Sequence, residues 1–139
     1  MFCHLIKSSN FFRIAYPHIK LTYFQEAGDK LLFKKIKDYQ EKYNKIPSFA
    51  DLKLTIDTDV DISIEDTTAL KSKLNDLRKC DLVSDEKLLL DSVEEWCQNR
   101  AIELATYDFI ESLEGGKADK GTKIEKIKEA MGIQFVVDV

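Results

Sequence analysis

The sequence predicts an all-α protein, with a globular helical head followed by a long helical hairpin. Only 5 Gly and 2 Pro occur among 139 residues, which is too few for the frequent turns of a β-sandwich or barrel. Apolar residues recur at helical spacing along most of the chain. The content of 44% hydrophobic and 33% charged residues is typical of a folded domain and excludes a disordered chain.

Two short helices are expected at the start of the chain, over 2–7 and 11–16. The polar run 8–10 offers N-cap side chains for the second helix. Pro17 ends that helix, because the residue before a proline is pushed out of the α conformation. An apolar connector over 19–24 then leads to the next helix.

The next helix is predicted over 26–43. Asn44 is its C-cap, and Pro47 follows three residues later. The residues of its apolar face recur at helical spacing. They are Leu32, Phe33, Ile36, Tyr39 and Tyr43.

Two further helices complete the predicted head. Ser48 begins a short helix, with Asp51 three residues later in capping-box-like spacing, and a longer helix runs over 63–79. The residues expected to face inward are Phe49, Leu52 and Ile56 on the first helix, and Ile64, Leu70, Leu74 and Leu77 on the second. These elements place the head at residues 1–80.

The longest predicted helix spans 85–114 and is capped by Ser84. About 30 helical residues extend roughly 45 Å, which is more than a head of this size can cover. A Gly-Gly turn at 115–116 and a last helix over 123–131 complete a hairpin at 84–132. The apolar tail at 133–139 has nothing after it in the sequence to pack on.

The hairpin carries more apolar surface than a pair of helices needs. Surplus apolar surface of this kind indicates burial against another subunit. The alternative is that the two helices fold back on the head of the same chain. The residues expected to line a hairpin–hairpin interface are Phe109, Ile110, Leu113, Ile124, Ile127 and Met131.

Charge is distributed unevenly along the chain. Residues 1–50 carry nine Lys/Arg and four Asp/Glu, whereas the formal net charge of the whole chain is −4. The only basic patch is 30–45, where Tyr23, Phe33, Tyr39 and Tyr43 interleave with the lysines. This pattern suits single-stranded nucleic acid, but it also suits an amphipathic helix whose aromatic residues face the core. The candidate nucleic-acid contacts are Lys30, Lys34 and Lys37.

We find no catalytic or cofactor site in the sequence. The glycines at 115–121 lack the order and spacing of a phosphate-binding loop, and no nucleophile motif is present. Cys3, His4, His18, Cys80 and Cys97 lack zinc-ligand spacing. No metal or cofactor is therefore expected in this chain.

Membrane insertion and secretion are not indicated. No uninterrupted apolar run exceeds three residues, which is too short for a transmembrane helix. The N-terminus lacks the features of a signal peptide. Three cysteines without paired spacing suit reduced thiols, so a cytoplasmic location is expected.

The chain resembles the N-terminal domain of DnaB-type replicative hexameric helicases, most closely the T4-type bacteriophage version. The order and spacing of the residues over about 130 positions support this, rather than any single motif. The residues are His4-Leu5-Ile6, Phe12, Tyr16-Pro17, Tyr23-Phe24, Phe33 with Ile36-Lys37, Tyr43 with Ile46-Pro47-Ser48, Gln98-Asn99-Arg100-Ala101, and Ile133 with Phe135.

The resemblance implies a function for the intact protein and for this domain. The parent would be a phage 5′→3′ DNA helicase that uses ATP and Mg²⁺ in a RecA-like ATPase domain outside this chain, joined through a linker that begins at 133–139. This domain would form the N-terminal tier of the ring through its hairpins, as a dimer or hexamer, and would dock primase and the helicase loader. The family's catalytic residues match no position here. The alternative is a stand-alone helical regulatory or single-stranded nucleic-acid-binding protein that uses the Lys30–Lys45 face.

Overall fold

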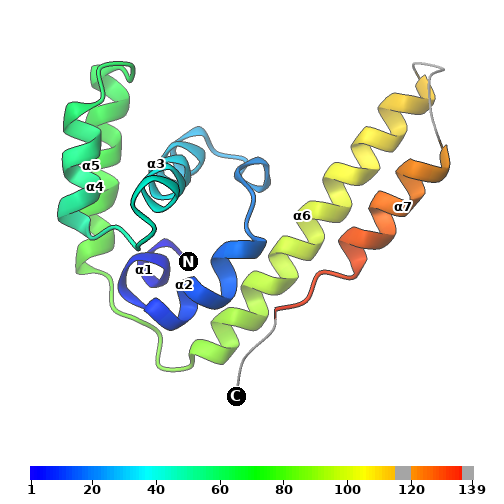
Figure 1. Cartoon of the computed structure of the whole chain (residues 1–139), viewed down its shortest axis with the longest axis horizontal. Coiled ribbons are helices and arrows are strands. Elements are labelled where there is room, and N and C mark those ends of the chain that lie inside the picture. Colours follow the sequence, from blue (N-terminus) through cyan, green and yellow to red (C-terminus); the bar gives the residue numbers. More distant parts are fainter. Residues whose placement is uncertain (115–119, 136–139) are drawn as a thin grey trace.

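The computed structural model describes residues 1–114 and 120–135, and side chains except at 114 and 120–124. All regular elements within these ranges are helical, as predicted (Figure 1). Two 3₁₀ turns, η1 (Tyr16–His18) and η2 (Leu21–Tyr23), accompany the α-helices. The α-helices are α1 (Phe2–Lys7), α2 (Ser9–Ala15), α3 (Ala27–Tyr43), α4 (Phe49–Thr58), α5 (Ile64–Lys79), α6 (Glu86–Glu114) and α7 (Lys120–Met131).

Local side-chain chemistry sets several of the helix ends. The Ser8 hydroxyl accepts a hydrogen bond from the Phe11 amide and begins α2. Ser48 and Asp51 form the predicted capping box of α4, each side chain accepting from the other's backbone amide. Asn44 ends α3 in the left-handed conformation, with φ 54°, which asparagine tolerates better than most residues.

The core of the head brings α1–α5 together around aromatic rings. Phe24 is central to this cluster: its ring lies 5.4 Å from that of Phe2, 5.0 Å from that of Phe33 and 5.2 Å from that of Trp96. The α4–α5 pair and the α6–α7 pair diverge on opposite sides of α1–α3 (Figure 1). The two pairs therefore project away from a shared base.

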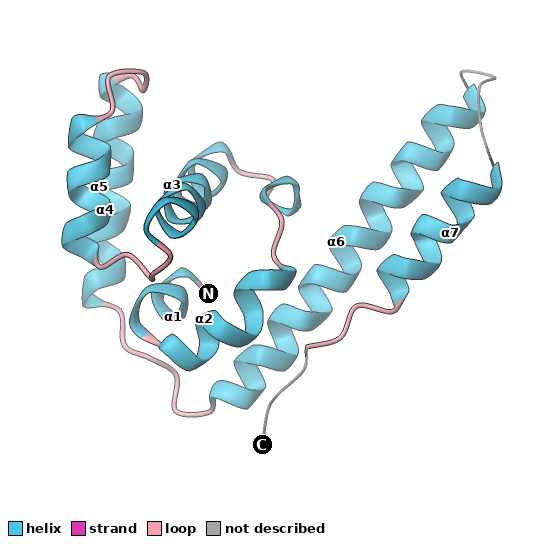
Figure 2. Ribbon diagram, viewed as in Figure 1, coloured by secondary structure: helices cyan, strands magenta, loops and turns pink. Residues whose placement is uncertain are grey.

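Helix α6 belongs to both the head and the hairpin. Leu90, Val93 and Cys97 in its first half are buried in the same core as α1–α5, and burial raises the pKa of the Cys97 thiol to about 12. The second half leaves the head and runs beside α7 (Figure 2). The sequence boundary near residue 80 thus marks a turn, while the core continues across it.

The structure corrects several details of the predicted helices. Helix α2 begins at Ser9, two residues before the predicted start. Tyr43, expected on the apolar face of the helix over 26–43, is 52% exposed. Helix α7 begins at Lys120, three residues before the predicted start. Ile64, expected to face inward, is 86% exposed. It lies in the first turn of α5, whereas Leu70 and Leu74 further along are buried, so only the later turns of α5 reach the core.

The first residues of the tail pack on earlier parts of the chain. The Gln98 side chain donates to the carbonyl oxygen of Ile133 (2.5 Å), and the Phe135 amide donates to the Glu94 carboxylate (2.7 Å). The Phe135 ring stacks on His18 with centroids 4.9 Å apart. Residues 133–135 therefore run back along α6 and the head. Residues 136–139 lie outside the described part of the chain.

Candidate functional site

The second half of α6 and the head-proximal end of α7 expose large apolar side chains. Tyr107 is 60%, Ile110 45%, Leu113 44% and Met131 64% exposed. The predicted interface residues Phe109 and Ile127 are partly buried. Ile124, the remaining predicted interface residue, has a side chain outside the described set. An apolar surface of this kind is typical of an interface.

Helical spacing explains why these side chains remain in solvent. Ile110 follows Tyr107 by three residues on α6, and Leu113 follows Ile110 by three, so these exposed side chains share one face of the helix. Among the described side chains of α7, only Ala130 is buried. A pair of helices buries just the strip along which they touch, so the face of α6 that carries these residues stays in solvent in the part of the chain that the structure describes.

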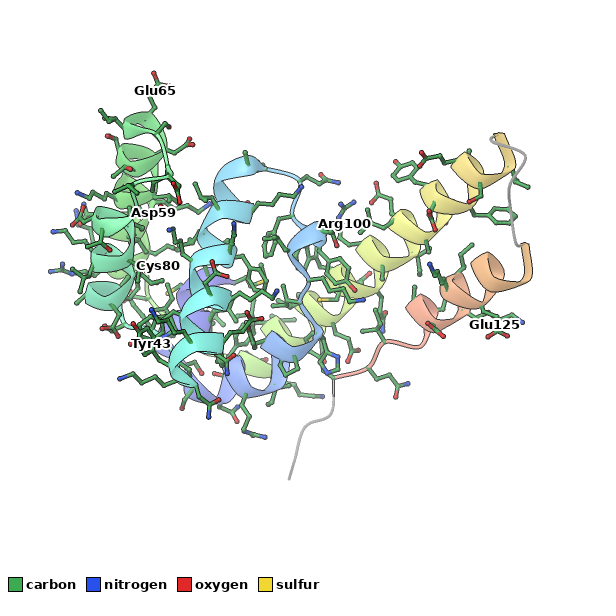
Figure 3. The ribbon with its side chains drawn as sticks, turned by 45° about the horizontal axis from the view of Figure 1, so that its top comes forward. Tyr43, Asp59, Glu65, Cys80, Arg100 and Glu125 are labelled. Atoms are coloured by element: carbon green, nitrogen blue, oxygen red, sulfur yellow. The ribbon has the colours of Figure 1, made fainter. Side chains whose placement is uncertain are left out.

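A buried arginine fixes the hairpin to the head. Arg100 lies on α6, close to the connector between α2 and α3 (Figure 3). Its Nε atom donates to the carbonyl oxygen of Tyr23 (2.6 Å), and Nη2 donates to that of Thr22 (3.4 Å). Nη1 pairs with the Glu103 carboxylate at 2.8 Å. Arg100 thereby satisfies carbonyl groups of η2 that have no partner within a regular helix.

A groove of about 800 Å³ lies where the head, α6 and α7 meet. Its floor is apolar, with Tyr23, Leu104 and Ala130, and its lining also includes Lys20 and Glu129. Cations and carboxylates are therefore mixed along this groove. Such a lining favours neither an anionic nor a cationic ligand, so it indicates no specific class of ligand for this groove.

The basic strip on α3 is exposed, but two of its four aromatic partners are buried, whereas Tyr43 is 52% exposed. Lys30, Lys34 and Lys37 all lie at the surface, and Lys37 pairs with Glu41 at 3.4 Å. Tyr23 and Phe33 are buried in the core. These two rings cannot stack on bases, so the second explanation of the pattern, an amphipathic helix with aromatic residues facing the core, holds for them.

The cysteines and His4 have structural partners. The His4 Nε2 atom accepts a hydrogen bond from the Val83 amide (3.2 Å), and the Cys3 thiol donates to the carbonyl oxygen of Cys80 (3.3 Å). These contacts join α1 to the segment after α5. Within the described residues, no three His, Cys, Asp or Glu side chains gather to form a metal site.

Sequence reasoning missed Arg100 and His4 as structural groups. A single arginine in an apolar stretch of helix is a signal for a buried, hydrogen-bonded cation, but the sequence does not tell which carbonyl groups it meets.

No protein-family model matches the chain, and no curated protein matches it. In the part of the chain that the structure describes, no helix has the length and apolar character needed to cross a membrane.

Proposed function

We propose that this chain is the N-terminal assembly and partner-docking domain of a phage replicative hexameric helicase of the DnaB type. The exposed apolar strip on the hairpin carries the proposal, because a two-helix projection exposing Ile110, Leu113 and Met131 is suited to pairing with a copy of itself. The resemblance in residue order along the chain supports the family.

The proposed assembly unit is a four-helix bundle made from two hairpins. In such a bundle each hairpin covers the apolar strip of the other. Because the strip residues are about half exposed, covering each one would stabilise the dimer by roughly 1 kcal/mol. Three dimers of this kind would make a hexameric tier, and the heads would remain free to bind primase and the loader.

The chemistry of the parent protein is assigned to a domain outside this chain. ATP and Mg²⁺ would bind there, and the residues of this chain would supply assembly and docking. We therefore expect the purified 139-residue chain to show no ATP turnover. Sustained, protein-dependent phosphate release in an ATPase assay would overturn the proposal.

The assembly proposal is tested by charge substitution on the hairpin. Phe109→Asp and Met131→Asp should each shift the chain toward monomer, because a carboxylate would be buried in the bundle. Light scattering over a concentration series measures this shift. Phe109 is partly buried, so the exposed Met131 keeps the test valid if Phe109→Asp alters folding.

Val60→Asp is the matched control, since Val60 is 93% exposed and lies between α4 and α5. It should leave the oligomeric state unchanged. A wild-type chain that stays monomeric at the highest attainable concentration would contradict assembly through the hairpin.

The alternative function is single-stranded nucleic-acid binding through the Lys30–Lys45 face. Lys30 and Lys34 are exposed on α3, but the burial of Tyr23 and Phe33 removes two of the rings that would stack on bases. Fluorescence anisotropy with a single-stranded DNA oligonucleotide separates the two functions. Micromolar, salt-sensitive binding that is lost in Lys34→Glu would favour the alternative.

A further inference from the structure

A second groove lies between α4 and α5, on the side of the head away from the hairpin. It has a volume of about 510 Å³. Phe49, Ala50 and Lys53 line it from α4, and Leu74 and Arg78 are among the residues that line it from α5. Helices α4 and α5 pack against each other here, so the groove follows the seam between two helices.

The groove combines an apolar floor with cations toward both ends. Leu74 is buried and Phe49 is partly buried, whereas Lys53 and Arg78 are exposed. Neither Lys53 nor Arg78 forms an ion pair with any residue that the structure describes. A third lining cation, Lys71, is paired with Asp57. Two cations in the groove are therefore available to a ligand.

Exposed apolar residues continue the groove face toward the tip of the α4–α5 pair. Ile64, which is 86% exposed, precedes Lys71 by two helical turns and so lies on the same face of α5. Leu54 follows Ala50 by one turn of α4 and is 63% exposed. The exposure of Ile64 thus has a structural explanation, because it lies on a helix face that no third helix covers.

We propose that this groove docks an acidic amphipathic helix of a partner protein. Its apolar side chains would contact Leu74, Phe49 and Ile64, and its carboxylates would pair with Lys53 and Arg78. Carboxylates along one side of a bound helix would face Lys53 on α4 and Arg78 on α5, as in other complexes where a helix lies in a groove.

The same contacts disfavour a nucleic acid as the ligand. Nζ of Lys7 lies 5.8 Å from the centroid of the Phe49 ring and donates to the carbonyl oxygen of Arg78 at 3.0 Å. The Lys7 ammonium group thus covers one face of that ring and makes it less available for base stacking.

The inference concerns the head alone and does not depend on hairpin assembly. The test uses the full chain and a fluorescent synthetic helix of about 18 residues, made of Leu, Ala and Glu, with a leucine stripe flanked on both sides by glutamates. A matching peptide with lysine at every glutamate position is the control. We expect anisotropy to show micromolar binding of the acidic peptide and none of the lysine peptide.

Charge reversal identifies the binding surface. Lys53→Glu and Arg78→Glu should each weaken the acidic peptide by about tenfold, because each removes one attraction and adds one repulsion. Lys34→Glu makes the same charge change at an exposed lysine of α3 and should leave affinity within about twofold. Equal weakening by all three variants would show general charge attraction and would overturn the site.

Three other outcomes would also overturn the proposal. The first is that the acidic peptide does not bind at millimolar concentration. The second is that single-stranded DNA binds more tightly than the peptide, through Lys53 and Arg78. The third is that Arg78→Glu changes the oligomeric state, which would identify a second copy of the chain as the occupant. Met131→Asp should leave peptide binding intact, so failure of hairpin assembly and failure of this docking site are distinguishable.

Discussion

The buried imidazole of His4 makes the stability of the head sensitive to mild acid. Its Nε2 atom accepts from the Val83 amide, which requires the neutral form at that nitrogen. Burial, followed by the charge of the N-terminus, lowers the pKa of His4 below its usual value of 6.5. Protonation therefore favours the unfolded chain.

The first prediction concerns pH. Since the pKa of His4 is lower in the folded state, the free energy of unfolding should begin to fall as pH drops below about 6.5. Urea unfolding at several pH values between 5 and 8 measures the slope. In His4→Gln the slope below pH 6.5 should be smaller. An unchanged slope would show that another group carries the effect.

The second prediction concerns Arg100, whose guanidinium satisfies the carbonyl groups of Thr22 and Tyr23. Arg100→Ala should lower the free energy of unfolding by about 2–3 kcal/mol, because buried carbonyl oxygens lose charged donors. Glu103→Ala removes only the 40% exposed end of the ion pair and should cost less than about 1 kcal/mol. Similar losses in both variants would contradict the role assigned to the carbonyl contacts.

At the scale of single elements, capping residues predict helix ends well. The third prediction is that Ser48→Ala lowers the free energy of unfolding by about 1 kcal/mol, because α4 loses half of its capping box. Ser72, exposed in the middle of α5, supplies the matched control. Ser72→Ala should be neutral or slightly stabilising, since alanine is the better helix former. Thermal and urea unfolding compare the two.

The same elements show how far the sequence predicts the fold. Caps at Ser48 and Asn44 and the periodicity of 26–43 depend on neighbours within a few residues, so these helix positions can be predicted. The exposure of Ile64 and the packing of Phe135 on His18 depend on residues distant in the chain. Local patterns cannot specify which helix face lacks a partner, or where a tail turns back.

The candidate surfaces were predictable to a similar, partial extent. Surplus apolar residues at Ile110, Leu113 and Met131 are visible as helical spacing, and the structure places all three at the surface. The α4–α5 groove was not predicted, because its cations Lys53 and Arg78 are 25 positions apart and come together only when the two helices pair. The contacts of Arg100 were missed for the same reason.

For the whole molecule, the continuous core predicts cooperative unfolding. The core includes residues from Phe2 to Cys97, so the head and the first half of α6 should unfold together. Trp96 is the only tryptophan and its ring contacts Tyr23 and Phe24, so its fluorescence reports on this core. The fourth prediction is that Trp96 fluorescence and the main change in far-ultraviolet circular dichroism share one midpoint. Two separated midpoints would show that α6 unfolds independently.

One consequence of α6 is mechanical. A single helix begins in the core and ends at the tip of the hairpin, so a tilt of its buried first half moves the second half with it. Glu114 is 17 residues beyond Cys97, about 26 Å away, so a rotation of about 10° at the head would displace that end of α6 by about 5 Å. A partner that tilts α6 at its base would therefore move the far end of the helix without touching it.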